Sequence, residues 1–458
     1  MKRGYAAAQC AAADQQKRVS STEVTPFFVF FFAIRPLRRV LFRFPVFGEI
    51  LKLMTSLIGI LLLPLFALAF SANRRAIKLR TVSVAFALQA GIGGVVLFTE
   101  SGFAALKFLS DYVATLLSYS NAGIRFMFGE LVDNSSLGFI FAFNVLPVVI
   151  FISALIAVLY HLRIMPWVIR VIGGALRKLL GTSHTESLSA AANVFVGQAE
   201  APLVVKPYIS GMTRSELFAV MVGGMASIAG SVMAGYVALG IPLEYLLAAS
   251  FMAAPGGLMM AKIMEPETHV PLAPQKNDPM VSDGYANVVD AAASGAMNGL
   301  RMAAAIAAML LAFIALIALF NGIFAWAGDL VGVGGLSLEG ALGSLFKPLA
   351  WALGVSWDEA AQAGSLIGQK LVLNEFVAYV AYVDIAEQLS PITQTIIIFA
   401  LCGFANFSSI AILLGGLGAL APQRRDDISR LGLRALLAAT LSNLMSAALA
   451  GFFVSLQA

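Results

Sequence analysis

The feature that most constrains this 458-residue chain is a series of eight apolar runs, each near the length of about 20 residues that a helix needs to cross a bilayer. The chain is 59% hydrophobic and 12% charged, with a mean hydropathy of +0.86, whereas soluble domains carry about 25% charged residues. We therefore expect an all-α, polytopic membrane protein with eight transmembrane helices. The expected spans are residues 55–71, 82–99, 138–160, 217–239, 245–264, 302–326, 393–417 and 435–454.

Basic clusters predict how these spans are oriented. The positive-inside rule places such clusters in the cytoplasm, and eight spans satisfy the rule here only if both ends of the core lie outside. The polar segment 265–290 is then the main cytoplasmic connector, and the amphipathic segment 101–133 is an interfacial helix region. The clusters are residues 74–80, 163–178, 206–214 and 424–434.

Two glutamates lie in apolar but interrupted segments, Glu200 in residues 184–209 and Glu375 in residues 356–382. A carboxylate at bilayer depth costs roughly 3 kcal/mol on insertion scales, so such residues usually face a cavity on a substrate or ion path. Each segment opens with a capping-box pattern, Ser-x-x-Glu, and is followed by the triplet Ser-Ile-Ala. We interpret the segments as two opposed re-entrant hairpins of an inverted repeat, which lines a cavity.

Residues 1–53 differ from the expected transporter core, residues 54–458. Their apolar stretch, residues 27–34, is too short to span a membrane, and their basic cluster at residues 35–43 would lie on the outer side of the first span, against the charge rule. One interpretation is an extra interfacial arm. The other, which we favour, is that translation starts at Met54 and the mature protein lacks the extension.

Polar side chains beside the two glutamates predict a binding site. Gln198 and Glu200 can form hydrogen bonds with a polar heterocycle, and the Glu375 carboxylate is suited to adjacent hydroxyl groups of a sugar. The alternative is that each glutamate is paired with a lysine for packing alone, Lys206 or Lys370 being the candidates.

Asn406 and Ser409 lie one turn apart on one helix face, next to Phe404, whose ring can stack on a base. The alternative for these residues is structural, because buried Asn and Ser often join membrane helices.

A cation site is expected near the first hairpin. Asn193 and Ser227, with the backbone carbonyls of Val196 and Ile228, offer the oxygen ligands that sodium prefers, and unwound backbone in broken helices supplies such carbonyls.

Other classes of protein are disfavoured. The chain has no Gly-x-x-x-x-Gly-Lys loop, so an ion gradient must drive any transport. The apolar cores contain no histidine and no His-Glu-x-x-His, which argues against an intramembrane enzyme, and we expect no resident cofactor.

Cys10 and Cys402 are too few for a disulfide framework or a metal site. The excess basic charge precedes Met54, so we expect no nucleic-acid partner. A passive channel, which would not accumulate solute, remains an alternative.

Three linked motifs closely resemble the concentrative nucleoside transporter family, from about Met54 to the C-terminus. They are Asn193-Val-Phe-Val-Gly-Gln-Ala-Glu-Ala-Pro-Leu-Val-Val205, Asn374-Glu-Phe-Val-Ala-Tyr379 and Gly403-Phe-Ala-Asn-Phe-Ser-Ser-Ile-Ala-Ile-Leu-Leu-Gly-Gly-Leu-Gly418. The resemblance implies a homotrimer in the bacterial inner membrane that imports nucleosides, each protomer having eight spans and two opposed hairpins.

The resemblance also implies roles for the residues. Gln198 and Glu200 would contact the base, together with Ala199, where the family motif often has Thr or Ser. The ribose would be held by Glu375, Asn406 and Ser409, with Phe404 nearby, and sodium by Asn193, Val196, Ser227 and Ile228. Some bacterial relatives use protons, so proton coupling is the alternative to sodium. Transport of another small polar solute is a further alternative.

Overall fold

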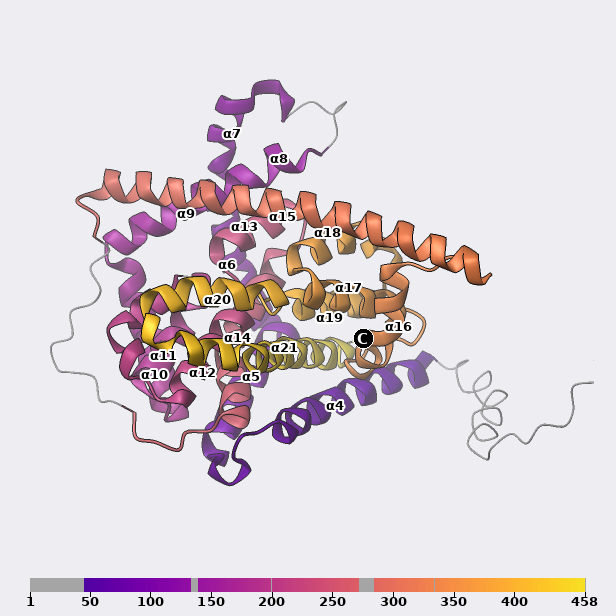
Figure 1. Ribbon diagram of the computed structural model, residues 1–458, viewed down its shortest axis with the longest axis horizontal. Coiled ribbons are helices and arrows are strands. Elements are labelled where there is room, and N and C mark those ends of the chain that lie inside the picture. Colours follow the sequence, from indigo (N-terminus) through magenta and orange to yellow (C-terminus); the bar gives the residue numbers. More distant parts are fainter. Residues whose placement is uncertain (1–44, 133–138, 199, 272–283, 333, 458) are drawn as a thin grey trace, which may run out of the picture. The chain divides into compact units, whose positions relative to one another are not determined.

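The computed structural model describes residues 45–132, 139–198, 200–271, 284–332 and 334–457 (Figure 1). All regular elements in these ranges are helical, which confirms the all-α class. Residues 52–458 form one compact unit. Residues 1–44 of the N-terminal extension lie outside the described residues, and helix α4 (Pro45–Ala69) runs without interruption through the expected boundary at residue 53.

Six helical stretches in the described ranges are long and apolar enough to cross a membrane, and they match six of the eight predicted spans. One of them, α15 (Val288–Val331), has 44 residues. At 1.5 Å per residue it is about 66 Å long, so the expected span 302–326 is only its middle part. The six stretches are Leu79–Phe98, Phe141–His161, Arg214–Ala238, Leu243–Met264, Val288–Leu330 and Pro422–Ser455.

Two of the predicted spans are broken near their middle, so the expectation of continuous helices was wrong there. Span 217–239 consists of α12 (Arg214–Ala226) and α13 (Gly230–Ala238), and span 393–417 consists of α19 (Pro391–Leu401) and α20 (Phe407–Leu420). The remaining predicted span, 55–71, corresponds to the apolar part of α4.

The two breaks are joined to each other by a hydrogen bond between their backbones. Ser227 and Ala229 adopt extended backbone between α12 and α13, and Gly403, after α19, has a φ of +147°, which favours glycine. The amide of Phe404 donates a hydrogen bond to the carbonyl of Ser227 at 3.1 Å. The unwound segments of the two halves are therefore joined through their backbones.

The two predicted hairpin segments each fold as a pair of short helices. The first contains α11 (His184–Ala192) and η3 (Ala201–Gly211), and the second contains α17 (Ala360–Val372) and α18 (Glu375–Ile385). Their re-entrant placement remains a prediction, as does the repeat. The two Ser-Ile-Ala triplets do not mark equivalent positions, because 227–229 lies in a break and 409–411 lies inside α20.

One of the two predicted capping boxes is present. Ser183 and Glu186 form the reciprocal bonds of a capping box at the start of α11. The second expected box, Ser356 with Glu359, was wrong, because Glu359 itself is the N-cap residue of α17. Its carboxylate accepts hydrogen bonds from the start of α19 instead.

The amphipathic segment 101–133 folds into α6 (Glu100–Ser118), α7 (Ser120–Phe128) and η2 (Gly129–Leu131). Helix α6 buries Leu106 and exposes Phe108 and Tyr112. Its interfacial position remains a prediction. The other elements are η1 (Arg74–Ala76), α5 (Leu79–Phe98), α8 (Phe141–Asn144), α9 (Leu146–His161), α10 (Ile164–Leu180), α14 (Leu243–Met264), α16 (Leu338–Ala352), η4 (Ala386–Gln388), η5 (Pro422–Arg424) and α21 (Arg425–Ser455).

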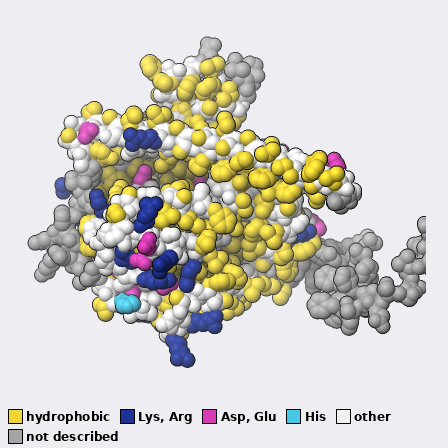
Figure 2. Space-filling view, in the orientation of Figure 1, with side chains coloured by type: hydrophobic (Ala, Val, Ile, Leu, Met, Phe, Trp, Pro, Cys, Tyr) yellow, Lys and Arg dark blue, Asp and Glu magenta, His cyan; other side chains and the backbone are white. Residues whose placement is uncertain are grey.

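Figure 2 shows hydrophobic side chains over much of α15 and charged side chains gathered at the left, where α10 to α12 and the start of α21 overlap in this view. Helix α15 exposes Leu311, Leu319 and Trp326. Large apolar side chains on the outside of a long helix are expected where lipid replaces water as the solvent. The central part of the expected connector, residues 272–283, lies outside the described residues.

Candidate functional site

The carboxylate of Glu375 is held by side chains from two other helices. It lies in the first turn of α18, is 5% exposed, and follows the N-cap residue Asn374. Its Oε1 accepts a hydrogen bond from the Tyr236 hydroxyl of α13 at 3.0 Å, and its Oε2 accepts one from Asn406 Nδ2 at 2.9 Å. The second hairpin is thereby connected to both broken helices.

Asn406 has two functions at the start of α20. As the N-cap residue, its Oδ1 accepts hydrogen bonds from the Ser409 amide at 3.0 Å and the Ser408 hydroxyl at 2.7 Å. Its Nδ2 is therefore oriented toward Glu375. The predicted pair of Asn406 and Ser409 lies together, as expected from its spacing of three residues.

Gln198 connects the first hairpin to the same cluster. Its Nε2 donates a hydrogen bond to Ser409 Oγ at 3.0 Å, and Ser409 Oγ donates to the Phe404 carbonyl. The Gln198 Oε1 is buried and has no hydrogen-bond partner among the described residues. A continuous network of hydrogen-bonded polar groups thus runs from Gln198, at the tip of the first hairpin, to Glu375. Gln198 Oε1 is the acceptor of this network that remains unused.

Glu200 lies at the start of η3 and is only partly buried. Its amide donates to the Gly197 carbonyl at 3.0 Å, and its side chain has no ion pair within the described parts of the chain. The structure does not join it to Gln198 or Glu375 by a hydrogen bond. Ala199 lies outside the described residues.

Phe404 packs close to the turn of the first hairpin. A methyl group added at Gly197 would lie 3.8 Å from a ring carbon of Phe404 and 3.1 Å from the Ala229 side chain. The absence of a side chain at Gly197 therefore lets the hairpin tip approach both breaks closely.

The four predicted sodium ligands come from the first hairpin and the first break. Asn193 caps the C-terminus of α11, and its side chain lies next to the last turn of α12, because a methyl group at Gly223 would be 3.1 Å from Asn193 Nδ2. Val196 and Ile228 are fully buried, and the Ser227 hydroxyl donates to the Gly223 carbonyl at 3.0 Å.

The Asn193 Oδ1 is also buried, and no described residue donates a hydrogen bond to it. A free, buried amide oxygen beside unwound backbone is suited to a hard cation, which takes oxygen ligands. The free Asn193 oxygen therefore fits the expected ion, and the four-residue ligand set remains a prediction.

The lysine pairing considered for the two glutamates does not occur. Lys206 is exposed, and Lys370 Nζ donates at 2.8 Å to the Ala400 carbonyl and at 2.8 Å to Asn443 Oδ1. Tyr236 and Asn443 were missed by the sequence reasoning. A hydroxyl or amide within an apolar run is a weak signal, although buried groups of this kind require partners.

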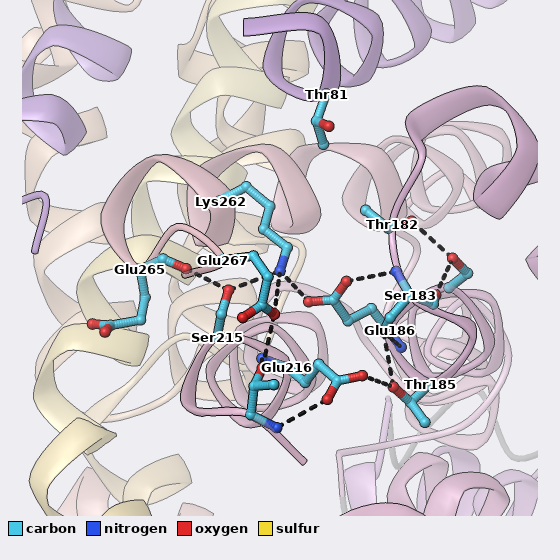
Figure 3. Close-up of polar contacts among 12 residues, drawn as sticks. Thr81, Thr182, Ser183, Thr185, Glu186, Ser215, Glu216, Lys262, Glu265 and Glu267 are labelled. Atoms are coloured by element: carbon cyan, nitrogen blue, oxygen red, sulfur yellow. Dashed lines mark hydrogen bonds and ion pairs between the residues drawn. The ribbon is translucent and has the colours of Figure 1, made fainter. Parts of the chain in front are cut away.

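Polar clusters also fix the bases of both hairpins. Figure 3 shows Lys262 of α14 pointing at Glu186, with which it forms a buried ion pair, while Thr185 donates to Glu216 of α12 at 2.6 Å. At the other base, Glu359 accepts hydrogen bonds from the Ser390 amide and hydroxyl at 2.9 Å each, and from Thr393. Each hairpin is thus tied to the first half of the broken helix that follows it.

Comparison with known proteins gives consistent matches over most of the chain. Family models described as "Na+ dependent nucleoside transporter N-terminus" and "C-terminus" match residues 58–131 and 245–451, and one described as "Nucleoside recognition" matches residues 142–243. An uncharacterised Bacillus subtilis transporter is 55% identical, covering 88% of this chain and 100% of its own. A Helicobacter pylori nucleoside permease is 47% identical, covering 88% and 98%.

Comparison with solved structures also gives matches over most of the chain. The structure of CNTnw in an inward-facing, substrate-bound state matches with a TM-score of 0.85 and 53% identity, covering 88% of this chain and 98% of that one. A variant of CNTnw in an outward-facing state matches with a TM-score of 0.84. These relatives are transporters and not enzymes. The chain is therefore a multi-pass membrane protein that belongs to the sodium-dependent, or concentrative, nucleoside transporter family.

Proposed function

We propose that this protein is a secondary active symporter that imports nucleosides and is driven by a sodium gradient. The observation that carries the proposal is the polar chain from Gln198 through Ser409 and Asn406 to Glu375, next to the unpaired oxygen of Asn193. This chain joins two hairpins and two helix breaks, which is where transporters of this kind bind their solute and ion.

The substrate would use acceptors and donors that the cluster already orients. Gln198 and Glu200, with Ala199 between them, would contact the base, and Phe404 would stack against it. Glu375, Asn406 and Ser409 would hold the ribose, since a carboxylate oxygen that already accepts one hydrogen bond can accept another.

Sodium would bind at Asn193 and Ser227 and at the carbonyls of Val196 and Ile228. Because Asn193 lies at the end of α11, the ion would order the tip of the first hairpin and so place Gln198 and Glu200 for the base. Binding of the ion and of the nucleoside would then be mutually favourable, as thermodynamic linkage requires.

The hairpin-bearing part would move relative to the rest of the protein in each cycle. CNTnw structures in outward-facing, intermediate and inward-facing states support this proposal, because their fold is similar. We also propose a homotrimer in a bacterial inner membrane, which native mass spectrometry of the purified protein would test.

The function can be tested by uptake of labelled uridine or adenosine into proteoliposomes. An inward sodium gradient should produce accumulation above equilibrium, and dissipating the gradient should abolish it. Equal uptake with and without sodium would refute sodium coupling. Accumulation that follows a pH gradient instead would establish the alternative, proton coupling.

A further inference from the structure

Lys370 is a buried cation that the proposed mechanism does not use. It lies in the last turn of α17, in the first arm of the second hairpin, and is 3% exposed. Burial of an ammonium group costs several kcal/mol of free energy unless its charge is compensated. Glu375 forms no ion pair with Lys370 within the described chain, although the two charges interact electrostatically; its oxygens accept hydrogen bonds from Tyr236 and Asn406.

The compensation comes from the ends of two half-helices. Lys370 Nζ donates to the carbonyl of Ala400, in the last turn of α19, and to Asn443 Oδ1. Asn443 Nδ2 in turn donates to the carbonyl of Ala226, the last residue of α12, at 2.6 Å. The C-terminal end of α19 thus contacts the ammonium group directly, and that of α12 is linked to it through Asn443. Helix C-termini carry partial negative charge and free carbonyls, so this is a favourable position for a cation.

The first half of the protein has a similar arrangement without a fixed charge. There Asn193 is the C-cap residue of α11 and lies next to the last turn of α12, whereas Lys370 lies in the last turn of α17 and its Nζ contacts the last turn of α19. Asn193 offers a neutral amide with a buried oxygen that lacks a donor in the described chain. Lys370 instead places an ammonium group against the end of the first half of the broken helix.

We propose that the Lys370 ammonium is a built-in cation that takes, in the second half, the place that an exchangeable sodium ion takes in the first, so that one sodium ion accompanies each nucleoside. This inference rests on the proposed sodium coupling. It explains why the second hairpin has a charged residue in the last turn of its first arm, where no ion pair with Glu375 is formed. The second hairpin would then be closed without an ion, and only the first would respond to sodium.

The test is the sodium dependence of uridine uptake by Lys370→Asn and Lys370→Gln in proteoliposomes. Because a Hill coefficient cannot exceed the number of coupled sites, it should be about 1 in the parent and rise above 1, toward about 2, in both neutral variants. Lys370→Arg, which keeps the charge, should retain the parent coefficient. The matched control is Lys262→Asn, which removes a buried ammonium that is paired with Glu186.

The outcomes separate this inference from the proposed function. A parent whose uptake does not depend on sodium would refute the coupling itself. With a sodium-dependent parent, an unchanged Hill coefficient in the neutral variants would refute the role of Lys370. Neutral variants that fold but are inactive at every sodium concentration would also refute the role of Lys370. So would neutral variants that never give monodisperse protein, if Lys370→Arg does give it. In both cases the lysine would be a structural residue that sodium cannot replace.

Discussion

Replacing Glu375 by glutamine should preserve the fold and weaken nucleoside binding. The glutamine carbonyl can still accept from Asn406 Nδ2, and its amide can donate to the Tyr236 hydroxyl, so the bonds seen at 2.9 and 3.0 Å have neutral replacements. The variant should therefore remain monodisperse, with only a modest loss of thermal stability.

The effect on the substrate should be larger. A hydrogen bond to a charged group contributes about 1.5–3 kcal/mol and a neutral one about 0.5–1.5 kcal/mol, so each ribose hydroxyl should lose about 1–1.5 kcal/mol. For two hydroxyls this corresponds to an increase in the uridine Kd of about 30- to 150-fold.

The assay is calorimetric binding of uridine and of 2′,3′-dideoxyuridine to parent and variant in sodium buffer. In the parent, uridine should bind much more tightly than its dideoxy analogue, and Glu375→Gln should remove most of this preference. Glu359→Gln is the matched control, because that carboxylate lies at the base of the same hairpin and binds Ser390 and Thr393. An unchanged preference in Glu375→Gln would refute the assignment of Glu375 to the ribose.

Two further substitutions test the sodium site and the helix break. Asn193→Leu removes the unpaired Oδ1 and should abolish the rise in melting temperature that sodium causes. In the parent this rise reflects a stabilisation of about 2.7 kcal/mol when the sodium concentration is 100 times the Kd. An unchanged rise in the variant would contradict the ion assignment. Gly403→Ala would place a methyl group 2.5 Å from Asn443 Oδ1 and 2.6 Å from the Ala226 carbonyl, at a φ of +147°, so it should lower the melting temperature strongly. Gly415→Ala, where no neighbouring atom lies within 4 Å, is its control, and equal melting temperatures for the two would contradict the argument.

The parts of this protein that the sequence predicted are those with local causes. Apolar runs of sufficient length define most of the spans, and a glutamate marks each of the two interrupted segments that fold as pairs of short helices. The cap at Ser183 was also predicted, because its partner Glu186 is only three residues away.

The remaining features depend on contacts between distant residues. The bond between Tyr236 and Glu375 joins positions 139 residues apart, and the bond from Asn443 to Ala226 spans 217 residues. The break after Ala226 has no proline, and its neighbours are small or apolar, so hydropathy alone predicted a continuous helix. The second capping box was wrong because α17 begins after Glu359 and not after Ser356, and the Glu359 carboxylate also binds Ser390 and Thr393 of another helix.

The most direct test of the binding site is a cryo-electron microscopy structure of the protein with sodium and uridine. The ribose should lie against Glu375 and Asn406, the base against Gln198, and an ion should be coordinated by Asn193 Oδ1. A nucleoside bound elsewhere, with Gln198 still donating to Ser409 and no density at Asn193, would contradict the proposed site.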